Sequence, residues 1–173
     1  MRARAAGINL AKGPIVLYNN IMINDREKYK KIVRELLRDP RIRKMQGYSQ
    51  HQTSNSLKHS LHVAMVSFAM AEKMRLRIDE KVLAIGAILH DYYLYDIKES
   101  GFSDYRHGTK HPQTALDNAM KEFKLTPKEQ NIIRSHMWPL TLLHPPKSKE
   151  AWIVCMADKF CAAKEMYGRR PDR

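Results

Sequence analysis

The chain contains 173 residues, of which 43% are hydrophobic and 28% are charged, and its formal net charge is +13. This length and composition fit one globular domain and exclude collagen-like, low-complexity and wholly disordered proteins. The apolar runs fall well short of the roughly 20 residues that a membrane span needs. Lys12 and Pro14 interrupt the apolar stretch near the N-terminus, which argues against an export signal. We therefore expect a cytoplasmic protein with no membrane partner.

The two cysteines, Cys155 and Cys161, are six residues apart in one predicted helix. They would lie on nearly opposite faces of that helix, which is poor geometry for a disulfide between them. We therefore expect reduced thiols, which agree with a cytoplasmic location.

The positive charge is concentrated in the first third of the chain. Residues 1–58 hold 13 basic and 4 acidic residues, whereas residues 59–173 hold 18 and 14. A basic protein attracts polyanions, so nucleic acid, nucleotides, phosphorylated metabolites and anionic lipid headgroups all fit as partners. Charge does not choose among them, and scattered basic faces that only keep the protein soluble fit equally well.

The first half of the chain predicts an irregular lead-in and two helices. Residues 1–24 mix glycine, proline and short apolar patches without sustained periodicity. Asp25 can cap a helix that ends near Asp39, and a polar connector follows over residues 41–53. A second helix, capped at one of residues 54–56, runs to about Met74 with a wide apolar stripe that implies deep burial.

The second half predicts further helices separated by polar loops. Asp79 caps a helix over residues 80–95, a loop covers residues 98–110, and Pro112 begins the next helix, which runs through Phe123. Another helix begins at Thr126–Pro127 and is stopped by Pro139. The last runs from Lys149 to about Tyr167, with Ile153, Met156 and Phe160 near one face, and Gly168 ends it. We predict an all-α bundle of five or six main helices, with residues 25–173 forming a single domain.

Two short motifs place polar groups inside the most apolar helices. His59 lies on the second helix, and His90–Asp91 ends the apolar run that begins at Ala84. Asp158 lies in an equally apolar helix. A lone histidine in such a place is more often a hydrogen-bonded core residue, but a buried aspartate needs a partner or a cation. One metal ion would satisfy all four side chains.

In this order, His59, His90–Asp91 and Asp158 resemble the signature of the HD superfamily of metal-dependent phosphohydrolases. The resemblance covers roughly residues 45–167, and His111 and His136 fall where some branches carry two further histidines. It implies an all-helical bundle of the HD type, whose central helices bring these side chains to one site.

The resemblance also implies how the metals would be held. The first would be bound by His59, His90, Asp91 and Asp158. His111 and His136 would bind a second, bridged by Asp91, which is thereby also a catalytic residue. One or two divalent ions per chain are implied, drawn from Fe, Mn, Zn, Co and Mg, which would acidify a water and neutralise phosphate oxygens. Because His111 precedes Pro112, we expect it at a helix N-terminus, where phosphate is also favoured.

The chain departs from the family pattern after the His–Asp pair. Many members have a lysine there that assists at phosphate, whereas this chain continues with Tyr92 to Asp96. Asp96 is a candidate proton donor to the leaving oxygen, although a helix-end or loop aspartate is the commoner role. Four basic residues are candidates to replace the lysine at phosphate, or are ordinary surface charges: Arg106, Lys110, Arg134 and Lys159.

The remaining histidines and the aromatic residues have less specific interpretations. A tyrosine group at residues 92, 93 and 95, with Trp138, can stack a nucleobase, but such aromatics more often belong to the core. His51 is interpreted as a loop residue, and His62 and His144 as structural or exposed.

We therefore hypothesise a metal-dependent phosphohydrolase that cleaves a phosphoester of a small molecule, with a nucleotide as the favoured substrate class. Two other functions stay open. A degenerate member that binds metal or nucleotide as a sensor would explain the missing lysine. A basic nucleic-acid-binding helical protein would explain the charge of residues 1–58, but we do not favour it. The sequence gives no oligomeric state.

Overall fold

The computed structural model describes residues 26–51, 54–95 and 104–167. Asp25, Asp96 and Gly168 lie outside these ranges, as does the lead-in over residues 1–24. The described chain is helical over residues 26–36 and then forms the elements α2 (Pro40–Arg43), η1 (Lys44–Gly47), β1 (Ser49–His51), β2 (Ser54–Asn55), α3 (Ser56–Lys73), α4 (Glu80–Leu89), α5 (Asp104–Glu122), α6 (Pro127–Ser135) and α7 (Lys149–Tyr167).

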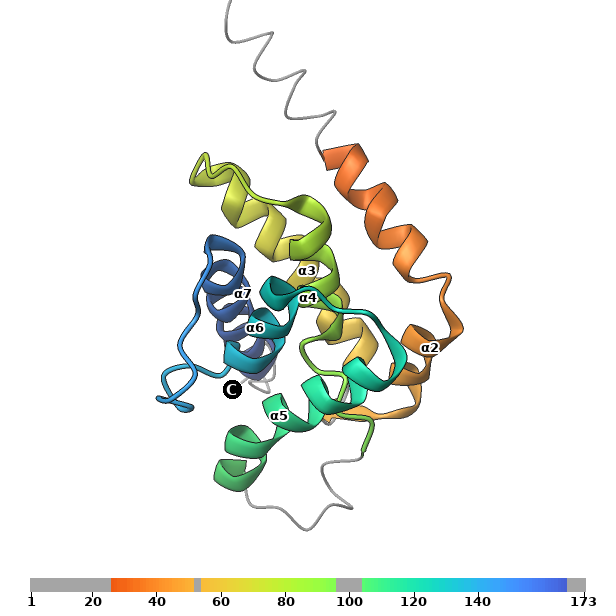
Figure 1. Ribbon diagram of the computed structural model, residues 1–173, viewed down its shortest axis with the longest axis vertical. Coiled ribbons are helices and arrows are strands. Elements are labelled where there is room, and N and C mark those ends of the chain that lie inside the picture. Colours follow the sequence, from red (N-terminus) through yellow and green to blue (C-terminus); the bar gives the residue numbers. More distant parts are fainter. Residues whose placement is uncertain (1–25, 52–53, 96–103, 168–173) are drawn as a thin grey trace, which may run out of the picture.

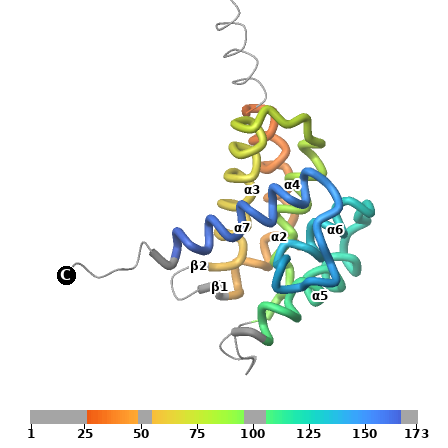
Figure 2. Tube along the Cα trace, turned by 90° about the vertical axis from the view of Figure 1, so that its left-hand side faces the viewer, coloured from red at the N-terminus to blue at the C-terminus, as the bar shows by residue number. Residues whose placement is uncertain are grey.

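The helices surround a core built on α3 and α4. Figure 1 shows these two at the centre, with α6 and α7 on one side and the helix over residues 26–36 on the other. α3 packs against both α4 and α7, and α6 packs against α4, α5 and α7. Figure 2 shows α7 crossing α3 obliquely. The all-α prediction is confirmed, with a two-stranded antiparallel hairpin, β1–β2, as a small addition among the described residues.

Local signals in the sequence account for several helix ends. The side chain of Asn55 accepts a hydrogen bond from Lys58 N and caps α3, and Asp79 caps α4 in the same way through Lys81 N and Val82 N. Thr126 and Glu129 form a capping box at the start of α6. These caps fall where the sequence predicted them.

A close approach between α4 and α6 depends on Gly86. A Cβ atom built there would lie 2.6 Å from Ile132 Cδ1 and 2.9 Å from Ile132 Cβ. Ile132 is fully buried, so it has little room to move away. The absent side chain therefore allows these two helices to pack, and both of them end beside the same cluster of histidines.

Three predicted boundaries were wrong. α4 ends at Leu89 rather than near Tyr95, and the chain turns at once through residues 90–93. The predicted loop over residues 98–110 is helical from Asp104 onward, so Pro112 lies inside α5 instead of starting it. His111 is therefore not at a helix N-terminus. The connector over residues 41–53 contains most of α2, all of η1 and the first strand of the hairpin, β1.

No helix among the described residues is both long and apolar enough to cross a membrane.

Candidate metal centre

Six side chains from five elements of the bundle converge in the interior. α3 contributes His59, the C-terminal end of α4 contributes His90 and Asp91, α5 contributes His111, the end of α6 contributes His136, and α7 contributes Asp158. All six are buried, with at most 7% of any residue exposed. The structure thus brings together every residue that the sequence proposed as a metal ligand.

One half of this cluster is centred on Asp158. Its Oδ1 lies 3.1 Å from His59 Nε2 and 3.6 Å from His90 Nε2. Asp91 Oδ2 faces the same two histidines, at 3.3 Å from His90 Nε2 and 3.9 Å from His59 Nε2. Two imidazoles and two carboxylates therefore share one small volume.

The other half is reached by the second oxygen of the same aspartate. Asp91 Oδ1 lies 3.2 Å from His111 Nε2 and 3.6 Å from His136 Nε2. The two histidine nitrogens are 2.7 Å apart. Asp91 therefore directs one carboxylate oxygen toward each pair of histidines.

In each of the four imidazoles, Nδ1 faces a hydrogen-bond acceptor outside the cluster. His90 Nδ1 donates to Ala87 O at 2.7 Å, and His136 Nδ1 donates to Ile133 O at 2.8 Å. Both histidines follow the last residue of a helix, where carbonyl groups lack intrahelical donors. His111 Nδ1 donates to His107 O at 3.0 Å. Because a carbonyl oxygen can only accept, the neutral form of each ring turns its Nε2 lone pair inward.

Inward lone pairs favour a cation in this volume. In their neutral forms, His111 and His136 would place two Nε2 lone pairs face to face, with the nitrogens 2.7 Å apart. A proton or a metal ion must remove the repulsion between these lone pairs. His90 Nε2 makes no hydrogen bond to any described residue. Two groups, His59–His90–Asp158 and His90–Asp91–His136, each keep their ligand atoms within 4.8 Å of one another. Nitrogen and carboxylate ligands of this kind fit Zn, Fe, Mn or Co.

The electrostatics of the cluster agree with that fit. Burial alone would raise the pKa of Asp91 and of Asp158, but the surrounding histidines hold the pKa of both carboxyl groups well below the ordinary range. Burial would lower the pKa of His59, but hydrogen bonds to Asp158 and Glu165 outweigh it and raise that pKa to about 9. Burial and the neighbouring histidines lower the pKa of His136 to about 3. The carboxylates are thus charged and ready to bind a cation.

The four basic residues proposed at phosphate occupy different surroundings. Lys159 Nζ donates to His136 O at 2.9 Å, so this residue contacts the cluster. Arg134 is half-buried, and Nη2 of its guanidinium lies 2.6 Å from His144 Nε2. Arg106 and Lys110 are exposed on α5, before His111 in the chain. The proposed proton donor Asp96 lies outside the described residues.

Two residues that sequence reasoning did not assign to the site contact its ligands. Glu165 Oε1 accepts from His59 Nδ1 at 3.1 Å, and the His107 ring stacks on His111 with centroids 4.6 Å apart. Glu165 is seven residues after Asp158, and His107 is four before His111. Residues seven apart share a helix face, so the predicted last helix contained a signal for Glu165, whereas His107 fell in a predicted loop and carried none.

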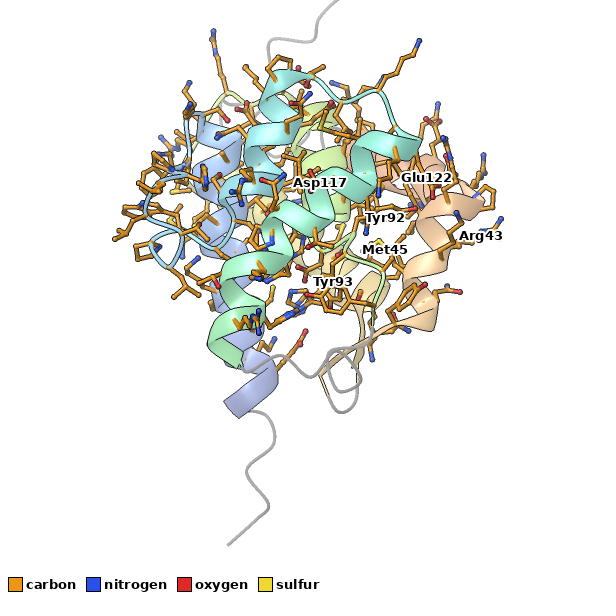
Figure 3. The ribbon with its side chains drawn as sticks, turned by 60° about the horizontal axis from the view of Figure 1, so that its bottom comes forward. Arg43, Met45, Tyr92, Tyr93, Asp117 and Glu122 are labelled. Atoms are coloured by element: carbon orange, nitrogen blue, oxygen red, sulfur yellow. The ribbon has the colours of Figure 1, made fainter. Side chains whose placement is uncertain are left out.

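The aromatic group divides between core and site. Tyr92 is buried, donates to Arg41 O and packs against Phe123, whereas Tyr93 packs edge-on against His111. Figure 3 shows Tyr93 beneath α5 and Tyr92 toward α2. Trp138 packs against Trp152. Tyr92 is therefore a core residue. Tyr93 is buried too, but it and the half-buried Tyr95, whose hydroxyl lies 2.9 Å from His107 Nδ1, lie beside the histidines.

The structure is that of a helical protein with a buried His/Asp cluster whose ligand atoms could hold a metal ion. A family model described as HD domain matches residues 56–163, more than half of the chain. The chain therefore belongs to the HD domain family, as its motifs indicated. No curated protein and no solved structure was found to match it.

Proposed function

We propose that this protein is a metal-dependent phosphohydrolase that cleaves a phosphoester bond of a small molecule, with a nucleotide as the favoured substrate class. The observation that carries the proposal is Asp91, whose two carboxylate oxygens face two separate histidine pairs. Such an aspartate suits two neighbouring cations. Membership of the HD domain family, whose members are generally metal-dependent hydrolases, supports the same reaction class.

The ligand residues would divide between two cations. His59, His90 and Asp158 would hold one, His111 and His136 would hold the other, and Asp91 would bridge them. Divalent cations in such a site lower the pKa of a bound water and neutralise phosphate oxygens. The two ions, drawn from Fe, Mn, Zn, Co and Mg, would be the cofactors.

The protein's own side chains would orient these ligands and receive the phosphate. Ala87 O, Ile133 O, His107 O and Glu165 fix the ring orientation of the four histidines, so each Nε2 stays directed inward. Lys159 is one candidate for binding a phosphate oxygen. Its ammonium donates to His136 O and also to Cys155 O and Sγ, and it would exchange one of these bonds for the phosphate. Arg106, Lys110 and Arg134 remain further candidates, and Asp96 remains the proposed proton donor.

The test is a phosphoester screen on protein reconstituted with each candidate metal in turn. We expect hydrolysis of at least one nucleotide or sugar phosphate, its loss on chelation and its return with metal. The matched variants are Asp158→Asn, which removes a ligand charge, and Asp117→Asn, an exposed change on α5. Metal retention without turnover on any phosphoester would overturn the hydrolase proposal and leave the sensor function. Metal-independent hydrolysis would contradict the site assignment.

A further inference from the structure

An exposed apolar surface runs along α7 and the connector over residues 136–148. We call it the apolar surface, and it consists of Leu140, Leu142, Leu143, Trp152, Met156 and Phe160. Its α7 members recur at every fourth residue and therefore share one face of the helix. The exposed fraction reaches 52% at Phe160, 72% at Leu142 and 88% at Leu143. Large apolar side chains exposed on neighbouring elements are typical of interaction surfaces.

The connector and α7 lie against each other, so the two parts adjoin. The rings of Trp138 and Trp152 pack edge-on with centroids 5.0 Å apart, and Cys155 Sγ donates to Trp138 O at 3.3 Å. Figure 1 shows the connector as a loop that projects beside α7. Leu142 and Leu143 are thus on a projecting loop rather than inside a groove.

The charges around the apolar surface are positive. Residues 134–165 contain five basic residues, Arg134, Lys147, Lys149, Lys159 and Lys164, and three acidic ones. The three acidic side chains are turned inward. Glu150 and Asp158 are 4% and 7% exposed, and Glu165 accepts from His59. This side of the molecule therefore presents apolar and cationic groups to its surroundings.

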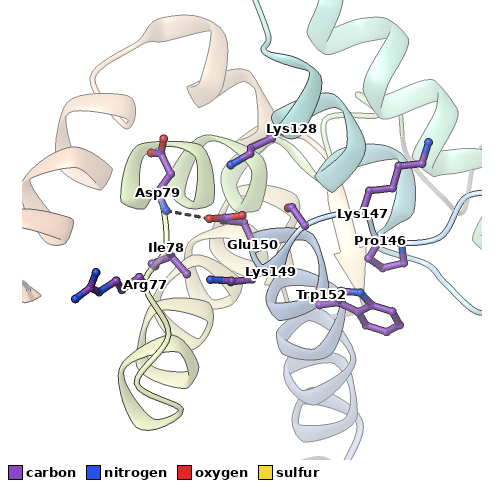
Figure 4. A pocket seen from close by; sticks show the side chains of 10 residues that line it. Arg77, Ile78, Asp79, Lys128, Pro146, Lys147, Lys149, Glu150 and Trp152 are labelled. Carbon is purple, nitrogen blue, oxygen red and sulfur yellow. Dashed lines mark hydrogen bonds between the residues drawn. The ribbon is translucent and has the colours of Figure 1, made fainter.

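A basic hollow borders the apolar surface at the N-terminal end of α7 (Figure 4). Its volume is about 710 Å³, and Trp152 lines it together with four basic side chains: Arg77, Lys128, Lys147 and Lys149. None of the four forms an ion pair with another residue of the described chain. Both carboxylates that line the hollow accept hydrogen bonds from backbone N–H groups. Asp79 accepts from the N–H of Val82 on α4, and Glu150 accepts from the N–H of Asp79. The hollow is thus suited to an anion.

We propose that the protein binds peripherally to an anionic lipid membrane, with the apolar surface entering the bilayer interface and the basic hollow holding headgroup phosphates. Leucine, phenylalanine and tryptophan beside lysine are the composition of interfacial membrane-binding surfaces. Each lysine near an anionic bilayer adds attraction. A second copy of the chain fits less well, because it would place one basic rim against another.

This inference is independent of the proposed hydrolysis. It differs from the expectation of no membrane partner, which rests on the short apolar runs and the interrupted apolar stretch near the N-terminus. Anionic lipid headgroups were already among the partners that the charge of the chain allows.

The test is sedimentation of the full chain with vesicles of phosphatidylcholine alone or of equal parts phosphatidylcholine and phosphatidylglycerol. We expect sedimentation with the anionic vesicles and little with the others. The double variant Leu142→Asp/Leu143→Asp should lower vesicle binding at least about tenfold. Lys147→Ala/Lys149→Ala should lower it about fivefold for each charge, on the anionic vesicles only. All four side chains are exposed, so the fold should persist, which circular dichroism checks.

Matched controls lie on other faces of the molecule. Met120 on α5 is 51% exposed, so Met120→Asp changes the same kind of group elsewhere. Lys31→Ala/Lys73→Ala removes two exposed charges from other helices. Both controls should sediment like the unmodified protein.

Several results would overturn the proposal. One is the absence of sedimentation with anionic vesicles, and another is undiminished binding by the Leu142→Asp/Leu143→Asp variant. Self-association that this variant abolishes, without vesicle binding, would identify an interface between copies instead. Binding of inorganic phosphate without any vesicle binding would assign the hollow to a free anion.

Discussion

Two buried carboxylates on α7 have opposite surroundings. Glu150, in the first turn, accepts a hydrogen bond from the backbone N–H of Asp79. Asp158, eight residues later, faces the imidazoles of His59 and His90. Burial would raise the pKa of each group, but hydrogen bonds lower it, through backbone N–H groups at Glu150 and through histidines at Asp158.

The difference separates a carboxylate whose partners are backbone groups from one whose partners could also bind a metal ion. The backbone N–H group that donates to Glu150 is fixed by the fold. This hydrogen bond joins α7 to the start of α4 and satisfies the carboxylate without a ligand. The imidazole nitrogens at Asp158 can exchange a proton for a metal ion. Burial alone therefore does not indicate a metal site, whereas imidazole nitrogens around a buried carboxylate are compatible with one.

Removing the shared carboxylate should have the largest effect. Asp91→Ala should abolish metal binding and lower hydrolysis at least about a thousandfold, because metal ions contribute several kcal/mol to such reactions. Elemental analysis and initial rates on the same samples measure both. The matched change Asp117→Ala, on the exposed face of α5, should leave them intact. Full activity in Asp91→Ala would show that the cluster is not the reaction site.

Metal affinity should rise with pH. The partners of Asp158 are imidazoles, which lose a proton as the pH rises, whereas Glu150 accepts from a backbone N–H group, which does not. The pKa of metal-free His59 is raised to about 9, so below that pH the ring carries a proton that a metal must displace. Burial would lower the pKa of His90, but Asp91 and Asp158 raise it well above its ordinary value, so this ring carries a second such proton. Each displaced proton makes affinity rise about tenfold per pH unit, and the share from His59 is complete above about pH 9. The pKa of His136 is lowered to about 3, so that ring is neutral and releases no proton when a metal binds. Titration calorimetry in buffers of different ionisation enthalpy would count the protons, and a pH-independent affinity would contradict this assignment.

Glu165 should tune metal affinity without binding metal itself. Glu165→Gln weakens the acceptor of His59 Nδ1 and should lower affinity about 10- to 100-fold, as is usual for such outer partners. Glu35→Gln, an exposed change on the helix over residues 26–36, provides the control. Competition with a chromogenic chelator gives both affinities. Equal affinities in the two variants would make Glu165 a surface residue that happens to lie near His59.

The smallest expected effect concerns packing. Gly86→Ala should destabilise the fold by about 1–3 kcal/mol, because the new methyl group meets Ile132 between α4 and α6. Gly47→Ala is the matched control, since nothing lies within 4 Å of a Cβ atom there. Urea unfolding of the metal-free variants gives both values. Equal stabilities would show that the interface relaxes without cost.

The sequence was sufficient to predict four members of the buried cluster, His59, His90, Asp91 and Asp158, because they are polar groups placed in apolar helices. His111 lies in a polar helix and His136 at the end of another, and both were proposed only through the resemblance to the HD superfamily. The sequence did not predict where the helices beside the cluster, α4 and α5, end and begin. Tyr92 extended the apolar run past Leu89 and predicted a longer helix, but its hydroxyl bonds to Arg41 O and its burial comes from tertiary packing. The start of α5 is polar and offers no periodicity, so Pro112 was taken for a first turn.

The exposed face of α7 could not be predicted for a different reason. Ile153, Met156 and Phe160 satisfy one apolar spacing, yet Ile153 is buried while the other two are 42% and 52% exposed. When a helix is apolar on most of its circumference, periodicity does not tell which side meets the core. Only the packing of α7 against α3 and α6 decides that.

The most direct test of the central claim, that the six buried side chains bind two cations, is metal content per chain. The protein should be purified without affinity-tag metals or chelators and compared with the double variant His111→Ala/His136→Ala. We predict two metal ions in the unmodified protein and one in the variant. A protein that holds no metal even after reconstitution would contradict the account.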